Sequence, residues 1–380
     1  MGKEKNAVGM TTVWQVAFTY FGAIVGAGFA SGQEILRFFV VFGKNGLLGA
    51  LASGVFFGWL GRLVLDMAAR EKMNGYNDLL CYLFTRRLSV VFDGIIALFL
   101  FFSLAIMLVA GGSLWEQLWG LPACLGFLGT LALVYLTLLA DLQGVFWLNT
   151  ALMPGLIVLT LVVAGCSLAG FSFNLVETYH EPFRAALGSL AVMNPLQGDF
   201  IGEHWLKAAG LYVSYNFVLG AVILASLGPT AGRGGRTGVF LGGVLLGLMA
   251  AVICSALLTR EGREITEAIP MLTLANRVHP WIGLAYSVAL WGAMVTTALS
   301  AGLGLLKRLL PIVTGPRWFC LLLVFLPTLP FVYWSFPQMV AVIYPLMGYL
   351  GLGLLLAIFY KTITDTALSF LARMFRTLRR

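Results

Sequence analysis

Charged residues are scarce in this sequence: only 11% of its 380 residues are Asp, Glu, Lys or Arg, against roughly 25% in an average soluble domain. Hydrophobic residues make up 60%, and many apolar runs reach the roughly 20 residues that a transmembrane helix needs. A soluble globular protein is therefore excluded, and the sequence predicts a polytopic helical membrane protein. The polar start MGKEKNAVGM runs directly into a long apolar segment, so no cleavable signal peptide is expected.

Cysteine and histidine are also rare, with five and three residues. The cysteines are scattered, odd in number and mostly inside apolar runs, which argues against a disulfide framework or a metal site. We find no nucleophile–base arrangement and no phosphate-binding loop, so neither an enzyme nor an organic cofactor is expected. The basic residues behind the net charge of +8 lie in the loops between apolar runs, which argues against nucleic acid as a partner. The expected partners are membrane lipid and a small molecule. The oligomeric state stays open.

Ten apolar segments have the length of membrane spans. Lys and Arg are concentrated in alternate loops, and the positive-inside rule then predicts a multi-pass protein of the cell membrane with both termini cytoplasmic. The predicted spans cover residues 11–40, 45–69, 88–110, 122–140, 144–169, 207–228, 236–258, 280–306, 318–335 and 339–360.

The ten spans divide into two sets of five. Because five is odd, the second set enters the membrane from the opposite side, as in transporters built from inverted repeats. Residues 259–279 are expected to form an outer cap. The predicted divisions are a first five-helix repeat (1–170), an extracellular loop with a short helix (171–206), a second repeat (207–360) and a basic amphipathic cytoplasmic tail (361–380).

The first span contains the segment GAIVGAGFASGQE, residues 22–34. Each glycine weakens a helix by about 1 kcal/mol relative to alanine, so four of them favour a break. Exposed backbone groups in a membrane are tolerated where a ligand, water or ion satisfies them. The alternative is that these glycines only let helices pack closely. Span 6 has the polar cluster Ser214-Tyr215-Asn216 followed by Gly220, and weak points in corresponding helices favour a binding site.

The sequence TYFGAIVGAGFASGQEILRFF, residues 19–39, resembles the first helix of the YkvI-like bacterial membrane proteins, a group of the amino acid–polyamine–organocation superfamily. The resemblance implies an all-α integral membrane protein with a LeuT-like 5+5 inverted repeat. Its ten transmembrane helices would surround a central site, with helices 1 and 6 unwound.

The resemblance also implies two sets of site residues. The motif AMVTT in span 8 matches a sodium site, where five neutral oxygens could replace the hydration shell of a hard cation. Threonines that bond back to the preceding helical turn are the alternative interpretation of that motif. The implied substrate-binding residues are Ala23, Ile24, Gly26, Gly28, Val213, Ser214, Asn216 and Leu219. The implied sodium ligands are Gly22, Val25, Ala293, Thr296 and Thr297.

Two departures from the family pattern bear on the coupling ion. Phe29 stands where two-sodium relatives have an asparagine, so a second sodium site is not expected. Span 5 has no charged residue, whereas sodium-independent relatives often have a lysine there. Both observations favour a single sodium ion.

Glu34 is an acidic residue inside the first span, and an intramembrane ionisable residue is a functional candidate by default. We expect it to act as a gate or a proton-responsive coupling group. The alternative is a helix end near the membrane surface, with Arg37 reaching water. The three acids Asp66, Asp93 and Asp141 lie near predicted helix ends, where capping explains them.

The sequence therefore predicts a secondary active transporter, with sodium-coupled symport of a small amino-acid-like or amine solute by alternating access. Two alternatives stay open. The first is a proton-coupled transporter. The second is a receptor of the same fold that binds a small molecule without moving it, as proposed for the germinant receptors of spores.

Overall fold

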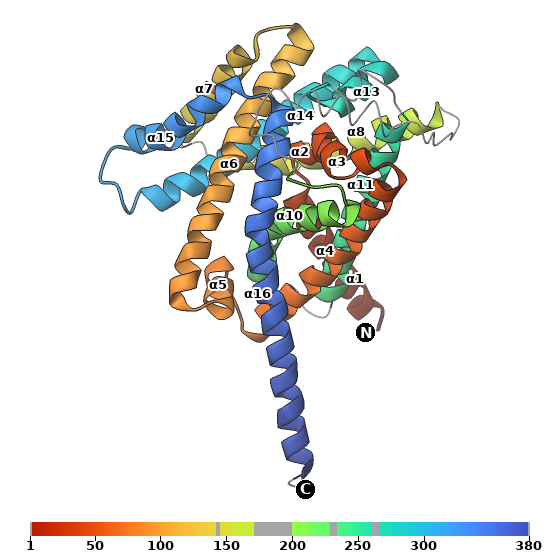
Figure 1. Ribbon diagram of the computed structural model, residues 1–380, viewed down its shortest axis with the longest axis vertical. Coiled ribbons are helices and arrows are strands. Elements are labelled where there is room, and N and C mark those ends of the chain that lie inside the picture. The colour runs from red at the N-terminus through yellow and green to blue at the C-terminus, as the bar shows by residue number, and fades with distance from the viewer. Residues whose placement is uncertain (1, 142–144, 171–199, 229–233, 260–266, 379–380) are drawn as a thin grey trace.

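The computed structural model describes residues 2–141, 145–170, 200–228, 234–259 and 267–378 (Figure 1). The first span is divided into three helices: α1 (Gly2–Ile24), α2 (Ala27–Ser31) and α3 (Gln33–Phe38). The remaining spans of the first half are α4 (Lys44–Arg70), α6 (Arg86–Trp119), α7 (Ala123–Leu139) and α8 (Val145–Ala169). Those of the second half are α10 (Trp205–Leu227), α11 (Gly235–Leu258), α14 (Pro280–Leu309), α15 (Arg317–Phe325) with η3 (Leu326–Tyr333), and α16 (Phe336–Leu378). Shorter connecting helices are η1 (Val40–Phe42), α5 (Tyr76–Leu83) and α13 (Pro270–Val278).

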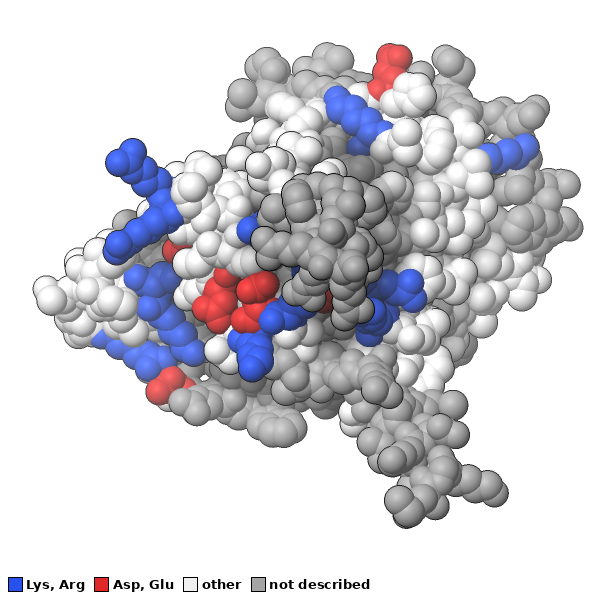
Figure 2. Space-filling model, turned by 90° about the horizontal axis from the view of Figure 1, so that it is seen from below, with Lys and Arg blue, Asp and Glu red and all other residues white. Residues whose placement is uncertain are grey.

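The predicted spans are confirmed within the described residues. Seven helices are long and apolar enough to cross a membrane, and three shorter apolar helices lie at Val13–Ile24, Ala123–Leu139 and Arg317–Tyr333. Together they fall on the ten predicted ranges, so the chain is a multi-pass membrane protein. Figure 1 places both termini at the same end of the molecule, and Figure 2 shows Lys, Arg and a group of acidic side chains on that face.

Helices of the first half pack against their counterparts in the second half. Contacts between the two halves include α1 with α10, α4 with α11, α6 with α14, and α7 with α15. Each pair joins spans five apart in the order of the ten. This is the arrangement expected when two five-helix units are related by a twofold axis in the membrane plane. Figure 1 shows α1, α4, α10 and α11 on one side and α6, α7 and α15 on the other.

Glycines bring α4 and α11 unusually close together. A Cβ on Gly54 would lie 2.6 Å from the Cα of Gly247, and a Cβ on Gly243 would lie 2.6 Å from the Cα of Gly58. Small residues permit this approach because dispersion between closely packed helices replaces the missing hydrophobic driving force in lipid. The role of these glycines in α4 and α11 is therefore close helix packing. The same role was the alternative interpretation of the glycines in span 1.

The break predicted in span 1 is present, but the break predicted in span 6 is wrong. Helix α10 runs from Trp205 to Leu227 without interruption. Its polar residues have partners that suit an intact helix: the Ser214 hydroxyl donates to the Gly348 carbonyl of α16 (2.7 Å), and the Asn216 amide donates to the Tyr212 carbonyl (3.2 Å). Gly220 lets α1 approach, since a Cβ there would lie 2.9 Å from the Tyr20 ring.

The predicted loop features have different outcomes. The short helix expected within 171–206 falls mainly on residues 171–199, which lie outside the described part of the chain. The cap expected within 259–279 contains α13, which packs on α14, α8 and α2. The predicted tail continues α16 as far as Leu378, and this helix extends beyond the body of the molecule (Figure 1).

Candidate solute site at the break in the first span

The first span is broken at Val25 and Gly26. Gly26 is extended (φ −113°, ψ −175°), so the chain leaves α1 and enters α2 at an angle. The Val25 N–H still donates to the Phe21 carbonyl (2.9 Å), and the Gly26 carbonyl accepts from Ala30 N–H (3.1 Å). Between these two bonds lie the last carbonyls of α1 and the first N–H groups of α2, which have no partners within their own helices.

Open space surrounds the glycines at this break. A Cβ on Gly22 or on Gly26 would meet no heavy atom within 4 Å. The adjacent Ala23 is partly exposed. Helix packing therefore does not account for Gly22 and Gly26, in contrast to the glycines between α4 and α11.

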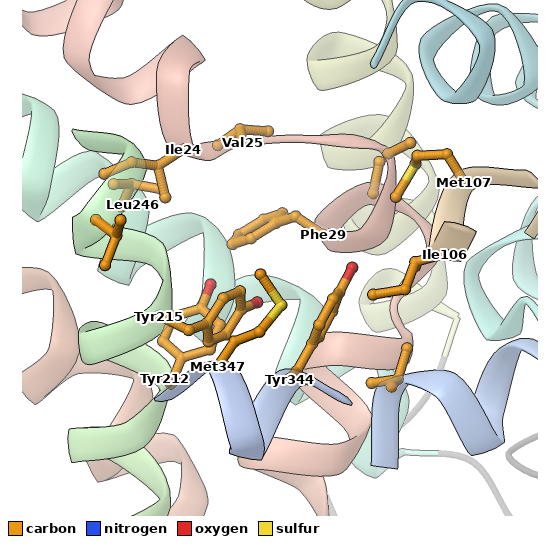
Figure 3. Close-up of a cluster of buried hydrophobic side chains, with 14 of the residues drawn as sticks. Ile24, Val25, Phe29, Ile106, Met107, Tyr212, Tyr215, Leu246, Tyr344 and Met347 are labelled. Atoms are coloured by element: carbon orange, nitrogen blue, oxygen red, sulfur yellow. The ribbon is translucent and has the colours of Figure 1, made fainter. Parts of the chain in front are cut away.

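The surroundings of the break are mostly apolar, with three tyrosine hydroxyls among them. Figure 3 shows the hydroxyl ends of the tyrosines directed toward Phe29 and the segment that carries Val25. The residues labelled in Figure 3 are all buried. The labelled residues are Ile24 and Val25 at the end of α1, Phe29 on α2, Ile106 and Met107 on α6, Tyr212 and Tyr215 on α10, Leu246 on α11, and Tyr344 and Met347 on α16.

The carboxyl group of Glu34 lies inside the protein, with only 6% of the residue exposed. The Tyr215 hydroxyl donates a hydrogen bond to Glu34 Oε2, and the Tyr344 hydroxyl is a second hydrogen-bond partner. Gly28 leaves room for this group, because a Cβ there would press on the carboxyl and lie 2.7 Å from Tyr344 Oη. Gly28 therefore contacts Glu34. The carboxyl is held by hydroxyl groups of α10 and α16, two helices that are distant in sequence from α3.

The predicted substrate residues of α10 lie on different sides of that helix. Val213 and Asn216 are seven and four residues before Gly220, so they share its α1-facing side. Ser214 faces α16, where its hydroxyl is bonded to the Gly348 carbonyl. Leu219 is 38% exposed. Substrate binding by this set remains a prediction.

The five predicted sodium ligands belong to two helices. Ala293 and Thr296 are buried in α14, where the Thr296 hydroxyl donates to the Ala293 carbonyl (3.1 Å), and Thr297 is partly buried. Gly22 and Val25 are at the end of α1, which packs mainly on α11 and α10. Contact between α14 and the first span runs through α2: the Tyr286 hydroxyl donates to the Ala30 carbonyl. The sodium site likewise remains a prediction.

A cap segment, residues 267–278 including α13, lies against the junction between α2 and α3 at Gly32 and Gln33. The Gln33 amide donates to the Glu267 carbonyl (2.9 Å). The Gln117 amide of α6 donates to the Ile269 carbonyl (3.2 Å) and to Thr273 Oγ1 (2.9 Å), and its oxygen accepts from Ile269 N–H (3.0 Å). The cap segment is therefore fastened to the first span and to α6.

Sequence reasoning missed Tyr212, Tyr344 and Gln117. Tyr215 belongs to the polar cluster of span 6, and Tyr212 lies three residues before it. This spacing was a usable signal that the two tyrosines share a helix face. Nothing local distinguishes Tyr344 or Gln117, because their partners are in other spans.

The helices, their pairing and the broken first span define a membrane protein with the LeuT-type fold. Two solved structures share it. "Inward facing conformation of Mhp1" matches 89% of this chain and 73% of that protein with a TM-score of 0.60 at 15% identity. A point mutant of the manganese transporter from Eremococcus coleocola matches 90% of this chain and 78% of that protein, with a TM-score of 0.53 at 19% identity.

The predicted resemblance to the YkvI-like proteins extends over nearly the whole chain. The uncharacterized membrane protein YkvI of Bacillus subtilis is 26% identical over 355 residues, which cover 91% of this chain and 95% of YkvI. The uncharacterized protein YyaD of the same organism is 25% identical over 339 residues, covering 89% and 93%. No family model matches the chain.

Proposed function

We propose that the chain is a secondary transporter that moves a small amino-acid-like or amine solute by alternating access, coupled to sodium. The observation that supports this most is the break at Val25 and Gly26, with open space around Gly22 and Gly26. Backbone groups at a helix break in a membrane need polar partners, and a polar solute and an ion provide them. The structural likeness to a manganese transporter supports transport as the activity.

Sodium is the proposed coupling ion because neutral oxygens suit a hard cation. The ligands would be the Gly22 and Val25 carbonyls of α1 with the Ala293 carbonyl and the Thr296 and Thr297 hydroxyls of α14. An ion held between α1 and α14 would make their separation depend on its presence. We further propose that both termini are cytoplasmic and that the protein lies in the cell membrane.

The first experiment measures thermal stability of the purified protein in sodium chloride and in choline chloride at equal ionic strength. A ligand that binds only the folded state raises its stability by mass action. We expect sodium-specific stabilisation that is lost in Thr296→Ala/Thr297→Ala. It should persist in the control Thr137→Ala, which removes a partly exposed threonine of α7 that bonds back to Leu133. Equal stability of the wild type in both salts would contradict sodium binding.

The second experiment measures accumulation of radiolabelled amino acids and amines in proteoliposomes under an inward sodium gradient. Gly26→Leu is the blocking variant, because its extended backbone accepts any residue and a Cβ meets no atom within 4 Å. We expect it to fold and to lose accumulation. A wild type that binds a solute without concentrating it would indicate a receptor and contradict transport.

A further inference from the structure

Glu34 is a buried titratable group that has neutral hydrogen-bond donors as partners and forms no ion pair with another described residue. The Tyr215 hydroxyl of α10 and the Tyr344 hydroxyl of α16 are its hydrogen-bond partners, and the Tyr212 ring of α10 packs edge-on against that of Tyr215. From α2 it meets the backbone at Gly28. Arg37 is three residues further along its own helix. Glu34 takes part in none of the ion pairs that join described residues to one another, which involve Asp66, Asp93, Asp141 and Asp365.

A carboxylate in such a place costs several kcal/mol unless something neutralises it. No group of three or more His, Cys, Asp and Glu side chains that could hold a metal ion is found among the described residues. A proton neutralises the carboxylate without added volume or further ligands.

Tyr212 provides an independent observation. Its hydroxyl is buried and has no hydrogen-bond partner among the described residues, which is uncommon for a buried polar atom. When Glu34 is ionised, its carboxylate only accepts hydrogen bonds. When Glu34 is protonated, it gains one O–H donor, and the Tyr212 oxygen is the neighbouring acceptor that lacks a partner.

We propose that Glu34, with Tyr212, Tyr215 and Tyr344, is a proton-binding site that loads and releases one proton as the protein changes conformation. The carboxylate takes the proton from water and later returns it to water, and no other bond forms or breaks. Tyr215 and Tyr344 stabilise the ionised form as donors, and Tyr212 stabilises the protonated form as an acceptor. The role of this proton in solute movement rests on the proposed transporter function, whereas the binding itself does not.

Glu34 lies between two features that would open to water if the protein changes conformation. Toward the break, Gly28 lies against the carboxyl, and Gly26, two residues earlier, borders open space. On the other side, the neighbouring Gln33 is bonded to the Glu267 carbonyl of the cap segment, so displacement of the cap segment would uncover the region next to Glu34. A group between two such features can exchange its proton with one side of the membrane at a time.

The test is difference infrared spectroscopy of the purified protein during a pH titration, without solute. We expect a carboxylic acid C=O band that disappears with rising pH, is absent in Glu34→Gln and persists in the control Glu116→Gln, which alters an exposed acid of α6. The tyrosine variants give opposite shifts of the titration midpoint. Tyr215→Phe and Tyr344→Phe remove donors and raise it by about one pH unit, a tenfold change in proton affinity. Tyr212→Phe removes the acceptor and lowers it.

The absence of a band sensitive to Glu34→Gln, over the pH range in which the protein stays folded, would overturn the proposal. A shift of the midpoint in the same direction for all three tyrosine variants would overturn the assigned roles. Because no solute is present, a titrating Glu34 in a protein that accumulates no solute would leave this site intact and count against transport alone.

Discussion

Replacing Gly28 with alanine tests the contact between the broken span and the Glu34 carboxyl. The added methyl group would press on the carboxyl and lie 2.7 Å from Tyr344 Oη. Overpacking of this kind costs about 1–3 kcal/mol. The better helix propensity of alanine offsets up to about 1 kcal/mol. We therefore expect Gly28→Ala to lower the free energy of unfolding by about 1–2 kcal/mol.

Gly22→Ala is the matched control, since Gly22 is also helical and a Cβ there meets no atom within 4 Å. It should leave stability unchanged or raise it by up to about 1 kcal/mol. The assay is thermal unfolding in detergent for both variants, each also made in the Glu34→Ala background. If the clash is with the carboxyl, Glu34→Ala should relieve most of the Gly28→Ala loss, a coupling of about 0.5–3 kcal/mol.

Two results would refute this reasoning. One is a Gly28→Ala variant as stable as Gly22→Ala, which would mean that the carboxyl is not beside Gly28. The other is an equal loss with and without the Glu34 carboxyl, which would place the clash elsewhere.

Two further predictions concern the cap segment and the face with the termini. Gln117→Ala removes three hydrogen bonds to Ile269 and Thr273, each contributing about 1 kcal/mol. Amide hydrogen exchange at Ile269 should therefore accelerate. Unchanged exchange would count against Gln117 as an anchor of the cap segment. Burial, then a hydrogen bond to Asp365, raises the pKa of Tyr82 from 10.0 to about 12. Its stabilising contribution should therefore persist to about pH 10 and be lost by about pH 12, as ultraviolet phenolate titration against Tyr82→Phe would test.

Membrane spans could be predicted from the sequence because their signal is local. A long apolar run needs no knowledge of its neighbours to be identified, and the break at Gly26 agrees with the low helix propensity of a segment rich in glycine. The ion pairs at the ends of the spans could be predicted only in part from the sequence. Asp66, Asp93 and Asp141 were interpreted as helix caps, but each pairs with an arginine of another helix, at Arg236, Arg308 and Arg317 respectively.

The wrong prediction for span 6 has a tertiary cause. Ser214 and Asn216 indicated a weak point, yet the Gly348 carbonyl of α16 and the Tyr212 carbonyl of α10 itself give them partners without unwinding. A polar residue in a span therefore predicts a break only if no neighbouring helix satisfies it. Glu34 was identified as a functional candidate from the sequence, but its tyrosine partners were not, since Glu34 and Tyr215 are 181 residues apart in sequence.

Gly32 explains how the Glu34 carboxyl comes to lie beside the break in the first span. Its left-handed conformation (φ +84°) ends α2 and starts α3 in a new direction, so the Glu34 side chain returns to Gly28 instead of lying one turn beyond it. If α2 and α3 move relative to α10 and α16 during transport, Glu34 must separate from Tyr215 and Tyr344. Separation from these donors changes its proton affinity. Because such coupling is reciprocal, proton occupancy must then bias the conformation by the same free energy.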